Sequence, residues 1–279
     1  MSKFVKVCAM ILAVTMMVSV LSACGSESSA NANNAGSANE QADIGLLKSG
    51  IYKVGVEIGY PPFELFADDG VTPMGLDIDL ANAIADILGV KVEFEDTAWD
   101  GIFAGLDVDK YDVVMSAVTI TAERAKTMDF SNPYIVNWQS IAVRKGSDPI
   151  TSVQGLEGLN VGFQGETTSD EYLTMMMDTG VVSCTKHSYD KVINAFDDLR
   201  NGRLDAVISD SVVSEGYIAR EPDIFELTWH QSNEADEEPE RFGVAVKKGN
   251  KALLDAVNNA LKILEDNGKL DEIRDNWLS

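Results

Sequence analysis

Residues 103–116 read FAGLDVDKYDVVMS, and residues 196–209 read FDDLRNGRLDAVIS. Five residues of the first stretch recur 93 residues later in the second: Phe103, Leu106, Asp112, Val114 and Ser116 match Phe196, Leu199, Asp205, Val207 and Ser209. Both stretches have the pattern of a helix, a turn and a buried strand that ends in a small polar residue. The repeat therefore predicts two lobes of similar plan.

A second, weaker repeat relates residues 54–56, Val-Gly-Val, to residues 161–163, Val-Gly-Phe. Each copy of the plan would then end a strand at a surface shared by the two lobes. Ligands in open α/β sheets bind beyond the carboxyl ends of the strands, so two such ends that face each other would form a cleft.

Strands and helices alternate along the rest of the chain. Leu80, Ile84 and Ile87 lie at helical spacing, and Gly89 ends that helix. Two helices close the chain, the second ending at Trp277. Further strands are predicted over residues 52–56, 90–94, 113–115, 159–163, 180–185, 204–208 and 224–229, and further helices over 169–177, 190–201 and 212–219. This alternation implies parallel sheets covered by helices, an α/β architecture.

Composition excludes several classes of function. The 279 residues include 22 Lys+Arg and 45 Asp+Glu, a net charge of −23, which would repel nucleic acid and anionic lipid. Three cysteines cannot form a disulfide framework, and no stretch after residue 24 is long and apolar enough to span a bilayer. The sequence has no Walker loop, no Cys-x-x-Cys and no clustered metal ligands, so we expect no cofactor and no metal.

The first 24 residues have the pattern of a secretory signal. Lys3 and Lys6 precede an apolar run, and the run ends in Leu-Ser-Ala-Cys at Cys24. This ending resembles the lipobox of bacterial lipoproteins, which implies cleavage of a signal peptide over residues 1–23 and attachment of lipid, including palmitate, to Cys24. An uncleaved N-terminal anchor is the alternative. Residues 24–43 are rich in Ser, Ala, Asn and Gly and predict a flexible tether. Cys184, the remaining thiol of the mature chain, is interpreted as a packed strand residue.

Residues 119–124, TITAER, follow the first buried strand of the repeat. Thr121 is a plausible N-cap, which places Arg124 in the first helical turn, where a cation is unfavourable unless an anion joins it. Backbone N–H groups, a threonine hydroxyl and a guanidinium fork together would form a receptor for a carboxylate. An ion pair of Arg124 with Asp129 explains the same residues equally well.

Two acids and two aromatic residues complete the candidate site. Glu57 follows the first strand, and Asp210 closes the strand of the second repeat, so either could accept a ligand ammonium group. Tyr60 could cover an aliphatic chain, and Trp99 could provide a flat wall. Taken singly, each of them is more commonly a core residue or a solvated acid.

Several segments in fixed order resemble the family 3 solute-binding proteins of ABC importers for polar amino acids. The segments are residues 60–64 (YPPFE), 75–80 (GLDIDL), 99–101 (WDG), 119–124 (TITAER), 129–134 (DFSNPY), 202–207 (GRLDAV), 242–249 (FGVAVKKG) and 267–270 (NGKL). The resemblance covers residues 50 to 279.

The resemblance implies the two-lobe periplasmic-binding-protein type II fold, or Venus flytrap, in which each lobe is a mixed, mainly parallel sheet flanked by helices. Two crossing strands would join the lobes near residues 134–138 and 238–242. Lobe 1 would comprise residues 44–136 and 241–279, and lobe 2 residues 137–240.

The resemblance also implies a ligand-binding site and the role of each residue in it. Arg124 matches the clamp on the ligand's α-carboxylate, and Asp210 matches the acid that receives the α-ammonium. Glu166 stands where the family has glycine, which leaves open whether its side chain reaches the ligand or faces water. The expected ligand-binding residues are Glu57, Tyr60, Trp99, Ser116, Ala117, Thr119, Arg124, Thr167, Thr168 and Asp210.

By this resemblance the protein is the substrate-binding component of an ABC importer. It would capture a free polar or cationic L-amino acid and deliver it to the permease subunits, as a monomer held by its lipid at the outer face of the bacterial cytoplasmic membrane. Nucleic acid is not an expected partner. The alternatives are an enzyme similar to cyclohexadienyl or arogenate dehydratase, with Glu57 or Glu166 as general acid, and a sensor-type amino-acid-binding domain.

Overall fold

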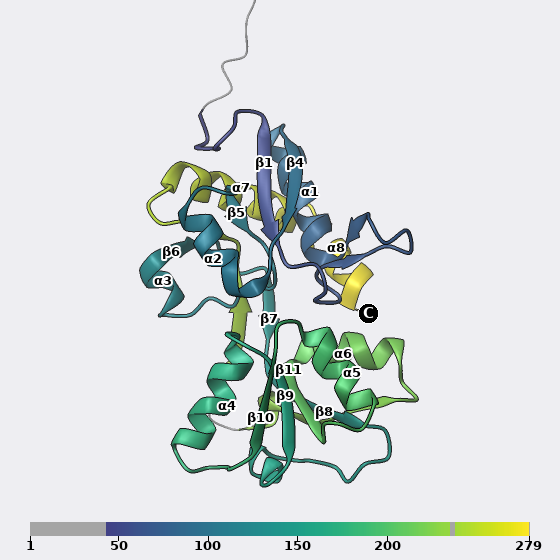
Figure 1. Ribbon diagram of the computed structural model, residues 1–279. Helices are drawn as coiled ribbons and strands as arrows, with labels where there is room; N and C mark the ends of the chain where they lie inside the picture. The colour runs from purple at the N-terminus through teal and green to yellow at the C-terminus, as the bar shows by residue number, and fades with distance from the viewer. Residues whose placement is uncertain (1–42, 235–237, 279) are drawn as a thin grey trace, which may run out of the picture. The chain divides into compact units, whose positions relative to one another are not determined.

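The computed structural model describes residues 43–234 and 238–278 (Figure 1). The predicted signal peptide, Cys24 and the predicted tether up to residue 42 fall outside the described residues. Within the described ranges, no helix is both long and apolar enough to cross a membrane. The strands of these ranges form two five-stranded sheets and two short strand pairs.

The first sheet has the strand order β4-β1-β5-β14-β6. β1 pairs in parallel with β4 and β5, whereas β14 is antiparallel to β5 and to β6. The strands are β1 (Ile51–Val56), β4 (Lys91–Asp96), β5 (Val113–Val114), β6 (Met128–Phe130) and β14 (Ala245–Lys247), with a small hairpin of β2 (Leu65–Phe66) and β3 (Pro73–Met74) beside them.

Successive strand residues point to opposite sides of this sheet, so each face carries apolar side chains. Helices cover both faces. Val113 packs in one apolar cluster with Leu80 and Leu253, and Val114 packs in another with Ile102. The helices are α1 (Leu76–Leu88), α2 (Trp99–Asp107), the single turn α3 (Arg124–Thr127), α7 (Lys251–Asp266) and α8 (Lys269–Leu278). α1, α7 and α8 pack against one another, and α2 packs on β1 and β5.

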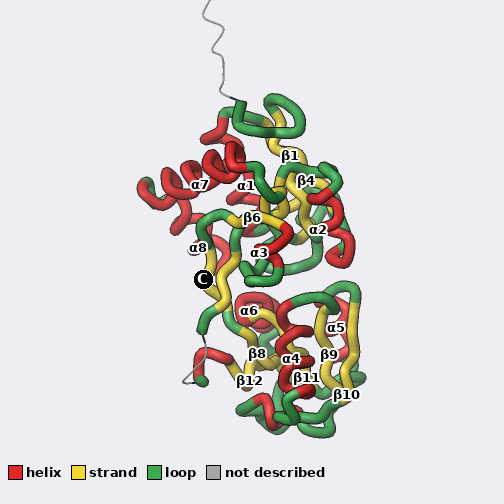
Figure 2. Tube along the Cα trace, turned by 90° about the vertical axis from the view of Figure 1, so that its left-hand side faces the viewer, coloured by secondary structure: helices red, strands yellow, loops and turns green. Residues whose placement is uncertain are grey.

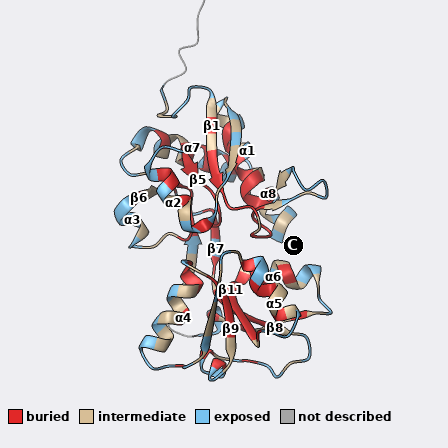
Figure 3. Ribbon diagram, viewed as in Figure 1, coloured by how far each residue is buried: buried red, intermediate tan, exposed pale blue. Residues whose placement is uncertain are grey.

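The second sheet has the order β10-β9-β11-β8-β12 and repeats the pairing pattern of the first. β9 is parallel to β10 and β11, whereas β8 is antiparallel to β11 and β12. The strands are β8 (Gln139–Arg144), β9 (Asn160–Gln164), β10 (Thr185–Tyr189), β11 (Ala206–Asp210) and β12 (Phe225–His230). The flanking helices are α4 (Thr168–Asp178), α5 (Val192–Arg200) and α6 (Ser211–Arg220), with short 3-10 turns at Val153–Leu156 and Gln231–Asn233 (Figure 2). The central strands of this sheet are almost wholly buried (Figure 3).

The repeat in the sequence corresponds to a repeat in the structure. Asp112 accepts a hydrogen bond from the backbone N–H of Lys53 at 2.7 Å, and its counterpart Asp205 accepts one from the N–H of Asn160 at 2.8 Å. In both lobes the acid therefore ties the loop before one strand to the start of its parallel neighbour. Gly162 lies against Leu204 so closely that an added Cβ would come within 2.4 Å of its Cδ1.

Two strands lie between the sheets and pair with each other. β7 (Ile135–Asn137) runs antiparallel to β13 (Glu240–Phe242), and Asn137 stands opposite Glu240 (Figure 1). These strands occupy the positions where the sequence predicts the two crossings.

One detail of the prediction differs from the structure. The strand predicted over 180–185 is wrong: residues 181–184 form the exit from α4, and β10 begins only at Thr185. β10 is an edge strand and carries polar residues, so it lacks the apolar pattern that the prediction relied on. Cys184 consequently precedes the strand, although it does pack, half-buried, against the core of the second lobe.

The sheets are mixed and mainly parallel, as predicted: in each sheet of the described residues four of the five strands run in one direction, and only β14 or β8 runs in the opposite one. In each sheet, as far as the described residues go, parallel pairs join three strands and antiparallel pairs add two more. Helix–strand alternation predicts the parallel pairs only. Strands β8 and β14 enter their sheets from the crossing segments rather than through a covering helix, so the alternation gives no sign of their direction.

Candidate functional site

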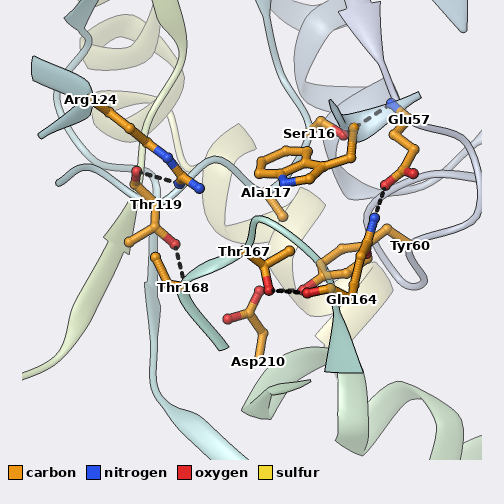
Figure 4. Close-up of a pocket in the computed structure, with 11 residues that line it drawn as sticks. Glu57, Tyr60, Ser116, Ala117, Thr119, Arg124, Gln164, Thr167, Thr168 and Asp210 are labelled. Carbon is orange, nitrogen blue, oxygen red and sulfur yellow. Dashed lines mark hydrogen bonds between the residues drawn. The ribbon is translucent and has the colours of Figure 1, made fainter. Parts of the chain in front are cut away.

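One pocket brings together all ten predicted ligand-binding residues. It has an empty volume of about 290 Å³ and lies where strand ends of both sheets meet (Figure 4). Its lining consists of Glu57, Tyr60, Trp99, Ser116, Ala117, Thr119, Arg124, Gln164, Thr167, Thr168 and Asp210.

Arg124 enters the pocket from the first lobe. Its Nη1 donates to the carbonyl oxygen of Thr119 at 3.0 Å, and the guanidinium carbon lies 5.3 Å from the ring centre of Trp99. Burial lowers the pKa of the guanidinium, but an arginine remains a cation at neutral pH. No ion pair involves Arg124 in the described part of the chain. The alternative pairing with Asp129 is wrong, because that carboxylate lies 2.8 Å from the ammonium nitrogen of Lys248.

The backbone and hydroxyl groups beside Arg124 are arranged by local contacts. Thr121 Oγ1 accepts from the N–H of Arg124 at 3.1 Å, but the helical turn begins at Arg124, so Glu123 and not Thr121 holds the N-cap position. Thr119 Oγ1 lies 3.5 Å from Thr168 Oγ1, which belongs to the second lobe. Ala117 has a φ of 47° and gives its N–H to Asp77 Oδ2 at 2.7 Å, so its carbonyl group is the part available to a ligand.

Two buried acids lie behind Ala117. Asp77 also accepts from the Tyr134 hydroxyl at 3.0 Å, and burial raises its pKa to about 6. Burial and the negative charge of Asp77 raise the pKa of Glu64 well above its ordinary value. The Glu64 carboxyl group therefore holds a proton next to Asp77, and this pair supports the segment that forms the pocket floor.

Asp210 enters from the second lobe, at the end of β11 and the start of α6. It accepts from the Tyr60 hydroxyl at 2.5 Å, from Asn137 Nδ2 at 2.7 Å and from Gln139 Nε2 at 3.1 Å. Burial raises the pKa of Asp210, and these three donors act in the opposite direction. The helix start adds a field that favours negative charge. A carboxylate held in this way faces the pocket opposite Arg124.

The third wall contains Glu57 and a residue that the sequence-based prediction missed, Gln164. Glu57 Oε2 accepts from Gln164 Nε2 at 2.7 Å, a contact between the lobes, and the same amide donates to the carbonyl oxygen of Asp190 at 3.0 Å. Within the described chain, Glu57 Oε1 and Gln164 Oε1 are buried without a hydrogen-bond partner. Burial raises the pKa of Glu57, while Gln164, Lys191 and the backbone of Trp99 lower it. This wall therefore contains two buried acceptor oxygens that have no donor of their own in the described chain.

The repeat contains a signal for Gln164. Residues 54–56 match residues 161–163, so Gln164 is the counterpart of Glu57, one residue past the matched segment. The same logic applied to the longer repeat pairs Ala117 with Asp210. Both pairs line the pocket.

The remaining second-lobe residues form the loop before α4. Thr167 caps α4 and donates its hydroxyl to the carbonyl oxygen of Gln164 at 2.8 Å. Glu166 has a left-handed backbone conformation, with a φ of 60°, and its side chain is exposed rather than part of the pocket lining. Its carbonyl oxygen accepts from Trp99 Nε1 at 3.0 Å, so this loop closes the pocket through its backbone.

Comparisons with known proteins agree with this geometry. The family model described as bacterial extracellular solute-binding proteins, family 3, matches residues 52–279. The L-cystine-binding protein TcyJ of Escherichia coli strain K12 is 35% identical over 241 residues, which are 85% of this chain and 87% of the relative. The ABC transporter arginine-binding protein 1 of that strain is 34% identical over 227 residues, 80% and 88% of the two chains. The solved structure of an ancestral arginine-binding protein bound to arginine matches with a TM-score of 0.75 and 38% identity, covering 82% of this chain and 99% of the other.

Proposed function

Because the chain belongs to the bacterial extracellular solute-binding proteins of family 3, we propose that it captures a free amino acid between its two lobes and presents it to the permease of an ABC importer. The observation that carries this proposal is the opposition of Arg124 and Asp210 across one pocket. The relatives of this chain are solute-binding proteins, which favours capture over the dehydratase alternative.

The two charges match the two ends of an amino acid. Arg124 would hold the α-carboxylate and Asp210 the α-ammonium, and Thr119 and Thr168 would add hydroxyl groups near the carboxylate. Each charge-assisted hydrogen bond of this kind contributes about 1.5–3 kcal/mol. We place Arg124 in lobe 1, residues 44–136 and 241–279, and Asp210 in lobe 2, residues 137–240.

Closure of the lobes follows from this division. Neither lobe alone can pair both ends of the ligand, so the ligand makes its full set of contacts only when the lobes are together. A ligand shifts a conformational equilibrium by the difference in its affinity for the two states. The closed protein would be the form that the permease recognises.

Glu57 and Gln164 indicate the class of side chain. Their unpaired oxygens are acceptors, so the ligand must supply N–H or O–H donors at that end of the pocket. Glu57 and Asp210 together outweigh Arg124 in charge, which favours a cationic side chain over an anionic one. We therefore propose a basic L-amino acid, in line with an arginine-binding relative. Cystine, which the relative TcyJ binds, is the principal competing ligand.

The N-terminal segment would attach the protein to the membrane. We propose that residues 1–23 are removed as a signal peptide, that Cys24 carries lipid including palmitate, and that residues 24–43 tether a monomeric body at the outer face of the cytoplasmic membrane. The support is the sequence pattern alone. Labelling with a palmitate analogue should mark the wild-type chain and not Cys24→Ser, and equal labelling of both would remove this role from Cys24.

A thermal-shift screen of the twenty amino acids with cystine and ornithine tests the function itself. We expect the largest stabilisation from a basic amino acid, since a ligand that binds only the folded state raises its stability. Calorimetry on the best ligand should give one site per chain. Absence of any shift, or turnover of arogenate or prephenate, would refute the proposal.

A further inference from the structure

We propose that Glu240 is a positioning residue for the ligand's ammonium group: it and Asp210 form a pair of carboxyl groups that share one proton in the ligand-free protein and release it when the ammonium binds. This inference rests on the proposed function, because it takes Asp210 as the ammonium acceptor. Neither the sequence motifs nor the pocket lining includes Glu240.

The geometry of the pair is set by two amide side chains. Asn137 Nδ2 donates to Asp210 Oδ1 at 2.7 Å and to Glu240 Oε2 at 2.9 Å. Gln139 Nε2 donates to the same two oxygens, at 3.1 Å and 3.0 Å respectively. Because Asp210 Oδ1 and Glu240 Oε2 accept from the same two amide groups, the two oxygens lie near each other. Two negative charges this close repel each other, so the two carboxyl groups do not readily ionise together.

The fold places this pair at the crossing between the lobes. Glu240 is the first residue of β13 and stands opposite Asn137 of β7. Thr168, a pocket residue at the start of α4, donates its hydroxyl to Glu240 Oε2 at 3.4 Å. Glu240 therefore contacts a pocket residue directly but can reach a ligand only through Thr168, Asn137 and Gln139.

The surrounding groups decide which carboxyl group holds the proton. The charged and titratable groups that face Glu240 in the described chain are Asp210 on β11, Arg124 on α3 and Tyr60 after β1. Asp210 receives an additional hydrogen bond from Tyr60 and starts α6, whereas Glu240 has neither advantage. Burial and the charge of Asp210 raise the pKa of Glu240 to about 7. The proton accordingly resides on Glu240.

The ammonium group of the ligand reverses this balance. A positive charge beside Asp210 favours the ionised form of both acids, so Glu240 loses its proton to the solvent as the complex forms. The balanced step is protonated protein plus zwitterionic ligand giving the complex with ionised Glu240 and one released proton. By linkage, affinity should rise by up to about tenfold per pH unit below the pKa of Glu240 and level off above it.

Calorimetry in two buffers of different ionisation enthalpy counts the released protons. With L-arginine, or the amino acid that gives the largest thermal shift, wild-type protein should release a large part of one proton near pH 6 and almost none above pH 8.5. Glu240→Gln should release far less near pH 6 and lose the rise of affinity with pH. Glu238→Gln, an exposed acid two residues earlier, should behave as wild type.

The outcomes separate this inference from the proposed function. If no amino acid binds, the proposed function fails. If binding occurs but wild type releases no proton at either pH, or Glu240→Gln releases as many as wild type, the role of Glu240 is refuted. The wild-type comparison between the two pH values stands even if the Gln variant does not fold.

Discussion

Replacing Arg124 by alanine tests the centre of the proposed mechanism. The substitution leaves the ligand's carboxylate in the pocket without its charged partner, and truncating one member of a buried charge pair costs about 2–5 kcal/mol of binding free energy. At about 1.4 kcal/mol per factor of ten, the dissociation constant should rise by about thirtyfold to several thousandfold.

The fold should tolerate this change. In the described chain the side chain of Arg124 makes one hydrogen bond, to the Thr119 carbonyl, and lies near the rings of Trp99 and Phe103. Losing these contacts costs about 1–2 kcal/mol, and removal of a half-buried cation offsets part of that loss. The unfolding free energy of Arg124→Ala, measured by urea denaturation, should therefore stay within about 1.5 kcal/mol of wild type.

Calorimetry with the selected amino acid is the decisive assay. Arg124→Lys keeps the charge but loses the planar fork, so its affinity should fall between wild type and Arg124→Ala. Arg203→Ala controls for the loss of a positive charge elsewhere, because that side chain is exposed and pairs with Asp198. An Arg124→Ala protein that binds within threefold of wild type while remaining folded would show that Arg124 is not the carboxylate clamp.

Three further predictions concern the acids of the site. Asp210→Asn should weaken free amino acids far more than their N-acetylated forms, measured by competition, and equal losses would reject the ammonium role. The folded-state pKa values of Glu64 and Asp77 are raised, so the stability they contribute is full at low pH and is lost as pH rises from about 4 through those raised values. Glu64→Gln should flatten this fall in urea denaturation series between about pH 4 and 8, and an unchanged slope would contradict the assignment. Glu166→Gly should raise the unfolding free energy by about 0.5–1 kcal/mol, because an L-residue at φ 60° is strained. A stability loss there would show that the side chain matters.

Much of the site can be predicted from local sequence, because the key residues directly follow strands. Glu57, Ser116 and Asp210 stand at or just past the ends of β1, β5 and β11, and an apolar strand followed by a polar residue is visible without a structure. Topology then brings these ends together, since parallel neighbours end at the same edge of a sheet.

Other residues could not be found in this way. Glu240 lies in an acidic segment that has the composition of a solvated loop, and its partners Asn137 and Gln139 are about a hundred residues away in the chain. Only the antiparallel pairing of β13 with β7 brings them together, and no local pattern encodes that pairing. The misplaced strand over 180–185 has a related cause, because the edge strand β10 is polar and the apolar residues before it belong to a turn.

Repetition and divergence together explain how this scaffold can bind a dipolar ligand. Two copies of one plan place equivalent strand ends against a common pocket, and identical ends would present the same charge from both sides. Here the equivalent positions differ: Glu57 faces Gln164, and Ala117 corresponds to Asp210. Arg124 lies in the turn that follows β5 in the first lobe, whereas β11 leads directly into α6 in the second. The repeated plan of the fold thus forms the cleft. The differences between equivalent strand ends place Arg124 on the first-lobe side and Asp210 on the second-lobe side, as a ligand with fixed opposite charges would require.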